Sequence, residues 1–493
     1  MNTIKVRKQF KADKYRPKFH YQSPSQYMGD PNGTFFWDGY YHLFYQYNPD
    51  ESFDNPSRMH WGHTRSKDLV YWEDLPIALA PESGSPDYNG CFSGGSFEMN
   101  GLPALVYYGR DGGICIATSD ENLISWEKIP ENPVITKDIP KLPVPHWHPW
   151  DPSSIWQEGN HWYMLTGGRW EDGRDTAFLF RSENLYQWEY MHPFYEPGYE
   201  SDCSVPDFFK IDDKYVLNFS SHERGTQYYV GSYSNSIFIP EHHGQLTFPT
   251  QEMTPEKTST DLLNLESGNL LANNTLLDDN HRRIFFGWVC EGTNESTQRQ
   301  AGWSGVMTIP RVITLTNNYS LNSEPIPEIE KLRGTHYHQS GVTICGETEL
   351  ILPDAIPGNC MEVIIKFESD VAKEFGLSIL RSPEGKEKTD IYYERKSGNL
   401  ILDTNNSSLN TSVVGKGIQK APVRLDESGG LTIRIFVDHS IVEVFANGQT
   451  IVKRVYPFNQ DATRVTIFSR ESTTSINSIN CWGMKSIWPE LEN

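Results

Sequence analysis

The sequence contains no long hydrophobic run, no cysteine framework and no surplus of positive charge. No stretch of the 493 residues approaches the roughly 18 apolar residues that a membrane-spanning helix needs. The seven cysteines are dispersed without a Cys-x-x-Cys pair, which argues against a disulfide framework and against a zinc site. The net charge of −21 makes nucleic acid and anionic membrane surfaces poor partners, so we expect a neutral ligand.

The N-terminal segment, Met1–Lys18, is basic and polar, without the apolar stretch of a signal peptide. We therefore expect a cytoplasmic protein. A secreted protein whose leader had been removed would begin in the same way.

Helical periodicity is scarce, and short runs of β-branched and aromatic residues indicate an all-β fold. Four hairpins with polar turns are predicted at Phe35–Tyr47, Ser154–Gly168, Phe208–Ser221 and Thr275–Trp288. A second pattern repeats at Ser66–Trp72, Ser119–Trp126 and Ser182–Trp188, with starts 53 and 63 residues apart. Such recurrence is typical of a propeller, and the spacing leaves room for five blades between Lys18 and about Leu315.

The pattern changes after the predicted propeller. Pro325 and Pro327 precede a short helix-like stretch, Glu328–Leu332, and from about Thr335 onward strands alternate with Gly, Asn and Asp turns. We predict a five-bladed β-propeller over residues 1–322, a linker over 323–338 and a β-sandwich over 339–493.

Three acidic motifs stand near the starts of predicted hairpins: Asp30 in Gly29-Asp30-Pro31, Asp151 in Trp150-Asp151-Pro152, and the segment Glu200–Asp207. Each alone is compatible with an ordinary turn. The innermost strands of a propeller line its axis, so side chains at equivalent strand ends converge. Converging carboxylates suit glycoside cleavage, in which one attacks the anomeric carbon and a protonated partner, about 5–5.5 Å away in retaining enzymes, donates to the leaving oxygen. Aromatic residues, 13% of the chain, suit either sugar stacking or strand cores.

Several ordered blocks resemble glycoside hydrolase family 32, the invertase, levanase and inulinase group. The similar blocks are Phe19-His20, Met28–Gly33, Tyr41–Pro49, His60–His63, Ser66–Trp72, Leu75–Leu79, Gly90–Gly95, Ala301–Arg311 and Phe436–Asn447. The resemblance implies a five-bladed propeller with a β-sandwich and retaining fructoside chemistry. It also implies that Asp30 is the nucleophile and Asp151 the transition-state stabiliser. Residues implied to line the fructose subsite are Asn32, Gln46, Phe92, Ser93 and Trp303.

The chain departs from the family pattern at its sugar-contacting blocks. Gly29 replaces the usual Asn, and Trp150 replaces an Arg. The second change removes a charged guanidinium with several N–H donors and supplies an indole with one N–H donor and a flat face for stacking. Phe53 stands near the place of a missing Trp, so Trp150 and Phe53 are both expected to contact substrate.

The third acidic block departs most. The family's Glu-Cys-Pro-Asp becomes Asp202-Cys203, a two-residue insertion, and Pro206-Asp207. Alignment on Cys203 makes Asp202 the general acid. Alignment on Pro206 would place Ser204 there, and a serine cannot serve. Glu200 is the alternative general acid, and Asp207 is expected to be structural.

These residues predict an enzyme that releases fructosyl units from fructo-oligosaccharide, fructan or sucrose-like substrates, without a cofactor or metal. Alternatives are a fructosyltransferase, including one that forms or opens difructose anhydrides, an inactive carbohydrate-binding propeller, and an enzyme acting on another furanoside such as an arabinofuranoside. The expected partner is a small or polymeric carbohydrate, and the expected assembly is a monomer or a homodimer through the β-sandwich.

Overall fold

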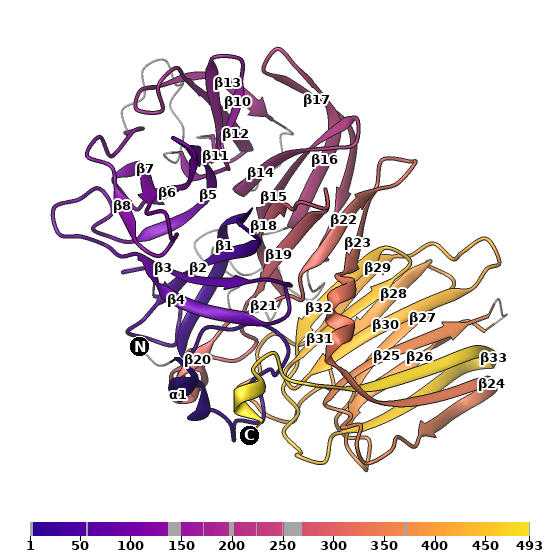
Figure 1. Cartoon of the computed structure of the whole chain (residues 1–493). Helices are drawn as coiled ribbons and strands as arrows, with labels where there is room; N and C mark the ends of the chain where they lie inside the picture. The colour runs from indigo at the N-terminus through magenta and orange to yellow at the C-terminus, as the bar shows by residue number, and fades with distance from the viewer. Residues whose placement is uncertain are drawn as a thin grey trace.

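The computed structural model of the protein describes residues 3–55, 58–136, 149–170, 172–196, 202–222, 224–248, 250, 269–368 and 372–492. The chain is nearly all β, and a propeller is followed by a β-sandwich, which confirms the predicted fold class (Figure 1). No helix within these ranges is long and apolar enough to span a bilayer.

Five antiparallel sheets form the blades of the propeller. Blade one contains β1 (Gln26–Trp37), β2 (Tyr40–Asn48), β3 (His60–Ser66) and β4 (Trp72–Leu79). Blade two contains β5 (Cys91–Met99), β6 (Leu102–Gly109), β7 (Gly113–Ser119) and β8 (Trp126–Lys128). Blade three contains β10 (Trp156–Glu158), β11 (His161–Arg169), β12 (Asp175–Ser182) and β13 (Trp188–Tyr195), with β9 (Trp150–Pro152) also paired to β11.

The last two blades complete the ring. Blade four contains β14 (Ser204–Ile211), β15 (Lys214–Ser221), β16 (Gly225–Ser234) and β17 (Ile237–Gln245). Blade five contains β18 (Leu270–Leu277), β19 (Arg283–Val289), β22 (Arg311–Leu315) and β23 (Leu321–Pro325), with β21 (Val306–Met307) paired to β19. The four predicted hairpins are β1–β2, β10–β11, β14–β15 and β18–β19.

The repeated Ser-to-Trp segments form the same turn in three blades, where each leads from the third strand to the fourth. One leucine in each turn has a left-handed backbone: φ is 63° at Leu69, 57° at Leu123 and 71° at Leu185. All three side chains are buried. The left-handed conformation costs roughly 1–2 kcal/mol, and burying a leucine side chain returns about 1.5–3 kcal/mol. Burial therefore favours this turn despite its backbone strain.

A short connection closes the ring of blades. Helix α2 (Glu295–Ala301) begins at Asn294, whose side chain accepts a hydrogen bond from the backbone of Thr297, and ends at Gly302 with φ 73°. The chain then enters β20 (Trp303–Ser304), which pairs in parallel with Gln26 and Tyr27 of β1. The segment between β19 and β21 of blade five is thereby attached to blade one.

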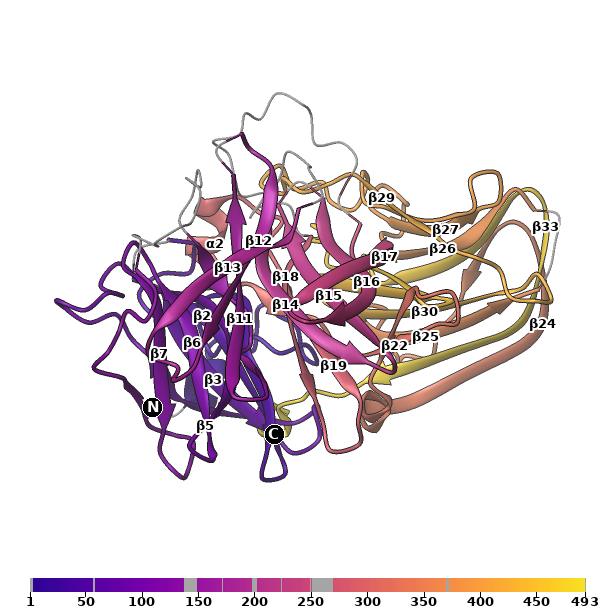
Figure 2. The same cartoon turned by 90° about the horizontal axis from the view of Figure 1, so that it is seen from above.

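The β-sandwich is built on one continuous set of paired strands (Figure 2). Its strands are β24 (Arg333–Leu350), β25 (Cys360–Phe367), β26 (Glu374–Arg381), β27 (Thr389–Glu394), β28 (Asn399–Asp403), β29 (Ile418–Pro422), β30 (Leu431–Asp438), β31 (Ile441–Ala446), β32 (Gln449–Arg454) and β33 (Arg464–Met484). The first half of β33 pairs with β26 and the second half with β25, so this long strand passes between the two layers. The 3-10 helix η1 (Pro327–Leu332) joins β23 to β24 and corresponds to the predicted helical stretch.

The two chain ends lie side by side at one edge of the molecule (Figure 1). Arg7 of α1 (Thr3–Lys8) stacks on Trp488, just before the 3-10 helix η2 (Pro489–Leu491), and pairs with Asp74 of blade one.

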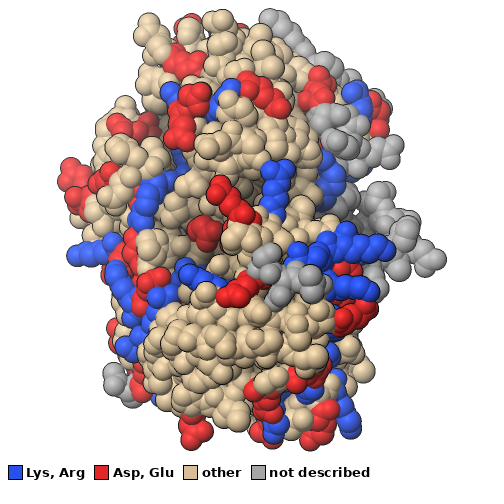
Figure 3. All heavy atoms as spheres, turned by 90° about the vertical axis from the view of Figure 1, so that its right-hand side faces the viewer, with Lys and Arg blue, Asp and Glu red and all other residues tan. Residues whose placement is uncertain are grey.

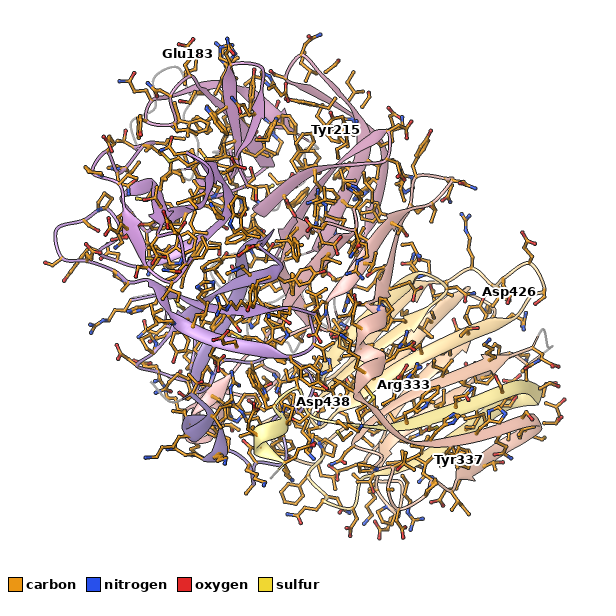
Figure 4. All side chains as sticks on the ribbon, in the orientation of Figure 1. Glu183, Tyr215, Arg333, Tyr337, Asp426 and Asp438 are labelled. Atoms are coloured by element: carbon orange, nitrogen blue, oxygen red, sulfur yellow. The ribbon has the colours of Figure 1, made fainter. Side chains whose placement is uncertain are left out.

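Propeller and sandwich share a buried polar junction as well as a common hydrophobic cluster. Asp438, at the end of β30, lies at this junction (Figure 4) and accepts hydrogen bonds from the backbone N–H groups of Lys18, Phe19 and His20. The His20 ring bridges Asp438 and Glu443, and Glu443 pairs with Arg311 of blade five at 2.6 Å. The orientation of the domains thus depends on ionic contacts without solvent exposure.

The charged surface is mixed on the face shown in Figure 3. Lys and Arg alternate there with Asp and Glu, and a broad uncharged area lies below them.

Candidate active site

The inner strands of four blades carry an irregularity near their starts. The register shifts lie between Met28 and Pro31 in β1, Cys91 and Gly94 in β5, Ser204 and Asp207 in β14, and Leu270 and Asn273 in β18. Such bulges bend a strand and redirect its side chains. In β14 one residue within the shift, Val205, has φ 45°.

Asp30 lies inside β1, at its bulge, and is held by a chain of hydrogen bonds. Ser93 Oγ donates to Asp30 Oδ2 at 2.6 Å, and Gln46 Nε2 donates to Ser93 Oγ at 2.7 Å. Burial raises the pKa of Asp30, while the bond from Ser93 opposes this rise. The structure therefore brings the predicted residues Gln46 and Ser93 to the predicted nucleophile.

Asn32 holds the backbone of Asp30 in place. Its Nδ2 donates to the backbone oxygen of Asp30 at 3.1 Å, and its Oδ1 accepts from Gly94 N of β5 at 3.2 Å. The side chain has no exposed surface. Asn32, predicted to line the sugar subsite, thus joins blade one to blade two beneath it.

Asp151 lies in β9 of blade three with a left-handed backbone, φ 43°, and is buried. Its Oδ2 accepts a hydrogen bond from Val205 N of β14 at 3.3 Å. Burial raises the pKa of Asp151 to about 7, and the negative charge of Asp30 contributes to this rise. Asp30 of blade one is therefore close enough to oppose the ionisation of Asp151 in blade three.

Asp202 stands just before β14 and accepts three hydrogen bonds. Ser204 Oγ donates to Oδ2 at 2.6 Å, His222 N donates to Oδ1 at 3.0 Å, and His222 Nδ1 lies 2.6 Å from Oδ2. Trp150 Nε1 donates in turn to Ser204 Oγ at 3.3 Å. Burial alone raises the pKa of Asp202, but the charge and hydrogen bonds of His222 outweigh it and hold the pKa well below its ordinary value.

His222 is the most important residue of this group that the sequence did not reveal. It follows the last residue of β15, within no recognisable motif. Its charge lowers the pKa of both Asp30 and Asp151, so it lies within electrostatic range of all three predicted carboxylates. Only the antiparallel pairing of β15 with β14 places it opposite Asp202.

Blade two contributes an aromatic and cationic edge. The Phe92 ring is partly exposed, lies edge-on to Tyr108 at 6.2 Å and has the Arg110 guanidinium 5.5 Å from its centre. Burial raises the pKa of Tyr108, and the charge of Asp151 raises it further. Phe92 thus stands beside the group of carboxylates.

A fourth carboxylate, Asp54, joins the site from the loop after β2. Burial and the charge of Asp30 raise its pKa to about 7, and the Tyr27 hydroxyl forms a hydrogen bond with it. Asp54 stands eight residues after Gln46, at the position where the family usually has Trp, and this spacing is the only sequence feature that could have pointed to it. The neighbouring Phe53 ring is partly buried and packs 5.4 Å from the guanidinium of Arg299 in α2.

Trp303 contacts residues outside this group of carboxylates. The ring is buried, its Nε1 donates to Asp13 Oδ2 at 2.7 Å, and Arg16 and Arg454 lie against its faces. The structure thus places Trp303, predicted to line the subsite, beneath blade one at the domain junction. The alternative acid Glu200 lies outside the described residues.

Asp207, expected to be structural, is buried and accepts a hydrogen bond from Thr275 Oγ1 of β18 at 2.6 Å. It links blade four to blade five. One group in the described part of the chain, Cys360, Asp438 and His439, has metal-like spacing, but Asp438 is already occupied by the donors at the domain junction.

The ring of Tyr27 occupies the space that a side chain at position 29 would need. A Cβ at position 29 would lie 2.7 Å from the Tyr27 hydroxyl oxygen and 3.2 Å from two ring carbons. Gly29→Asn, which restores the usual family residue, is therefore expected to displace Tyr27 from Asp54 and lower the free energy of unfolding by about 1–3 kcal/mol. Chemical denaturation measures this loss.

Gly39→Asn is the matched control, because a Cβ there meets nothing within 4 Å and Asn tolerates its φ of 76°. Equal stability of the two variants would contradict the steric role assigned to Tyr27.

Two stretches covering most of the chain match one enzyme family. Residues 20–325 match Glycosyl hydrolases family 32 N-terminal domain, and residues 328–483 match Glycosyl hydrolases family 32 C terminal. The chain belongs to glycoside hydrolase family 32. The resemblance read from the sequence motifs is thereby confirmed, and the protein is a glycosidase.

Family 32 relatives match this chain over nearly its whole length. Sucrose-6-phosphate hydrolase of Zymomonas mobilis subsp. mobilis is 30% identical, and the match covers 98% of this chain and 94% of that protein. An insoluble β-fructofuranosidase isoenzyme of Arabidopsis thaliana is 30% identical, and the match covers 96% of this chain and 90% of that protein. The crystal structure of fructan 1-exohydrolase IIa from Cichorium intybus shares the fold, with a TM-score of 0.83 at 24% identity, covering 96% of this chain and 98% of that chain.

Proposed function

We propose that this protein is a retaining β-fructofuranosidase that releases fructosyl units from β-fructosides through a covalent intermediate on Asp30. The observation that supports this most strongly is the juxtaposition of Asp30 and Asp151 from different blades: burial raises the pKa of Asp151 to about 7, and the charge of Asp30 contributes to this rise. Paired carboxylates with separated proton affinities are the requirement of glycoside chemistry.

In this proposal each carboxylate has its own task. Asp30, oriented by Ser93, attacks the anomeric carbon of the fructosyl unit, and the glycosidic oxygen leaves with a proton from the general acid, for which the sequence predicts Asp202 with Glu200 as the alternative. Asp151 binds ring hydroxyls and stabilises the positive charge of the transition state. Water then attacks the same carbon from the other side of the intermediate, which restores Asp30 and retains the anomeric configuration.

The relatives support hydrolysis over transfer. Their names describe sucrose-6-phosphate hydrolase, β-fructofuranosidase and fructan 6-exohydrolase, all of which imply release of fructose. The fructosyltransferase alternative is therefore not favoured. An inactive carbohydrate-binding propeller is not proposed either, because Asp30, Ser93 and Gln46 form a connected group suited to catalysis.

A product analysis tests the proposal directly. The purified protein is incubated with sucrose, sucrose 6-phosphate, 1-kestose, inulin, levan and difructose anhydrides, and products are separated by anion-exchange chromatography. We expect free fructose with initial retention of the β configuration by NMR. Absence of fructose release from every member of the panel, or inversion at the anomeric carbon, would contradict the proposal.

Trp150→Arg tests the substitution beside Asp151. A guanidinium there would stabilise the ionised form of Asp151 and lower its pKa from about 7 by about one unit or more. We expect the limb of the kcat/KM profile that reports this ionisation to move to lower pH, and sucrose cleavage to improve several-fold.

Trp150→Gln is the matched control, since it removes the indole without adding charge. If the Arg and Gln variants show the same pH profile, the charge at this position does not control Asp151.

A further inference from the structure

A second pocket lies at the end of the propeller opposite the carboxylates. Its volume is about 800 Å³, within the roughly 300–1,000 Å³ range of ligand sites. Asp30 lies near the start of β1 and Trp37, which lines the pocket, is the last residue of that strand. At about 3.3 Å per residue, the strand between them places the pocket about 20 Å from the proposed nucleophile. The walls come from three adjacent blades, one, two and five, and include Trp37, Asp38, Tyr40, Glu121, Asn122 and Asp279.

Trp37 presents a partly exposed indole ring to this pocket. Among the described residues, none stacks on the indole and none accepts a hydrogen bond from its Nε1. A tryptophan carries a large apolar face and one polar N–H, which usually finds a partner where the ring is buried. The apolar face of a sugar ring can pack on such an indole while a sugar hydroxyl accepts from the N–H.

His42 adds a hydrogen-bonding group to the wall of the pocket. Its ring stacks on Phe35 at 4.8 Å, and its Nδ1 lies 2.9 Å from Nε2 of His63. Burial, assisted by the charge of Arg65, lowers the pKa of His42 to about 3, so the imidazole is neutral near pH 7. Nothing in the described part of the chain bonds the second ring nitrogen, Nε2. A hydroxyl can pair with Nε2 in either tautomer, because a hydroxyl both donates and accepts.

The rim of the pocket consists of exposed turn residues with polar side chains. Asp38 lies in the β1–β2 turn and Asp279 in the β18–β19 turn. Glu121 and Asn122 lie in the turn from β7 to β8, which is one of the Ser-to-Trp repeats. Carboxylates accept hydrogen bonds from hydroxyl groups, and the amide both donates and accepts. Turns of three blades therefore supply hydroxyl-binding groups around the indole.

The charges around the pocket favour a neutral ligand. The carboxylates of the rim outnumber the guanidinium of Arg65, which also pairs with Glu73 at 2.8 Å. This surplus of negative charge disfavours phosphates, nucleotides and acidic polymers. A cationic ligand would meet Arg65 and Lys67, which lie 4.5 Å and 5.1 Å from the centre of the Tyr40 ring. An uncharged polyhydroxyl compound has neither disadvantage.

Resting on the proposed function, we infer that this pocket is a second carbohydrate-binding site, which takes a segment of a neutral fructan chain and holds the polymer on the enzyme. Trp37 stacks on a sugar ring, while His42 and the rim side chains bond its hydroxyls. Because the pocket and Asp30 lie at opposite ends of the propeller, a disaccharide occupies one site at a time. A long chain held at the pocket raises the local concentration of its own ends near Asp30.

Trp37→Ala tests the binding. Native gel electrophoresis in the presence of inulin or levan measures it, with Asp30→Asn as the parent so that the polymer is not consumed. We expect both polymers to retard the parent, and the dissociation constant to rise about three- to tenfold in Trp37→Ala, the size of one lost aromatic contact. Polygalacturonate, an acidic polymer, is expected to cause no retardation.

Two further variants separate this site from a general effect on the fold. Asp279→Ala changes an exposed turn outside β1 and is expected to weaken polymer binding about two- to fivefold, the size of one lost hydrogen bond. Tyr186→Ala is the matched control, because Tyr186 is 39% exposed in the Ser-to-Trp turn of blade three and does not line the pocket. It is expected to retain polymer binding. Thermal unfolding of each variant verifies the fold.

Kinetics give a second readout in the enzyme with Asp30 intact. In Trp37→Ala, the ratio of kcat/KM for inulin to kcat/KM for 1-kestose is expected to fall about three- to tenfold. An equal loss on both substrates would contradict a separate polymer site.

The inference would also be overturned by absence of retardation of the parent, by unchanged retardation in both Trp37→Ala and Asp279→Ala, or by an equal loss in Tyr186→Ala. Failure of the proposed function is distinguishable from these outcomes. It would appear as no fructose release by the wild-type protein from any fructoside, while polymer retardation and its dependence on Trp37 would remain measurable.

Discussion

Asp30→Asn is expected to lower fructoside turnover by about 10⁴-fold or more while leaving the protein folded. The carboxylate is the proposed nucleophile, and an amide cannot form the covalent intermediate. Ser93 can still donate its hydrogen bond to the amide oxygen, so the contact at 2.6 Å survives the change. Burial raises the pKa of Asp30, which means that the ionised side chain destabilises the folded state. A neutral isostere is therefore expected to keep or slightly increase the unfolding temperature.

The same variant has a second readout that does not depend on activity. Burial raises the pKa of both Asp151 and Asp54 to about 7, and the charge of Asp30 adds to each rise. Removing that charge is expected to lower both pKa values, which carbon NMR of labelled carboxyl groups can follow. Unchanged titration would show that the carboxylates do not meet at the propeller axis.

Asp38→Asn is the matched control for this variant, because Asp38 is exposed in the β1–β2 turn and Asn tolerates its φ of 47°. It is expected to keep wild-type kinetics and stability. Retention of more than about a tenth of wild-type turnover by Asp30→Asn would remove Asp30 as nucleophile.

The second large effect is expected at the domain junction, where Asp438→Asn is predicted to lower the free energy of unfolding by about 3–5 kcal/mol. Asp438 accepts from Lys18 N and Phe19 N at 2.7 Å, from His20 N at 3.0 Å and from His20 Nδ1 at 2.9 Å. An amide offers one acceptor oxygen and directs N–H groups toward these donors, which leaves buried polar atoms unpaired. Denaturant unfolding measures the loss.

Asp172→Asn provides the contrast. Asp172 pairs with Arg174 at 2.7 Å, but both side chains are exposed and solvent screens the pair, so its removal is expected to leave the free energy of unfolding nearly unchanged. A similar small loss at Asp438 would mean that the buried junction does not stabilise the protein.

The pH dependence of this junction has two sides. Burial alone would raise the pKa of Asp438, but its bonds to His20 hold the pKa below the ordinary value, so this stabilisation is present above about pH 4 and is lost as pH falls. Burial alone would lower the pKa of His20, but Asp438 and Glu443 raise it, so this stabilisation is complete below about pH 6.5 and is lost at higher pH. The junction is therefore expected to contribute most between about pH 4 and 6.5, and this contribution is expected to disappear in Asp438→Asn.

Much of the fold was predictable because its signals are local. Polar turns such as Asp38-Gly39 between aromatic runs predicted the hairpins. The Ser-to-Trp repeats predicted the propeller, and in the structure they form the turns around Leu69, Leu123 and Leu185. The family motifs also singled out Asp30 and Ser93, which the structure joins by a hydrogen bond.

The sequence by itself determined the strands, the propeller and sandwich, and the acidic residues from which a glycosidase site could be built, because turn chemistry and side-chain alternation act between near neighbours. Tertiary structure decided which of these residues meet. Pairing of β14 with β15 placed His222 on Asp202, ring packing placed Tyr27 over Gly29, and ring closure through β20 placed Trp303 beneath the site. These contacts join residues from 2 to 290 positions apart, and their geometry depends on bulges and strand register that short sequence patterns do not specify.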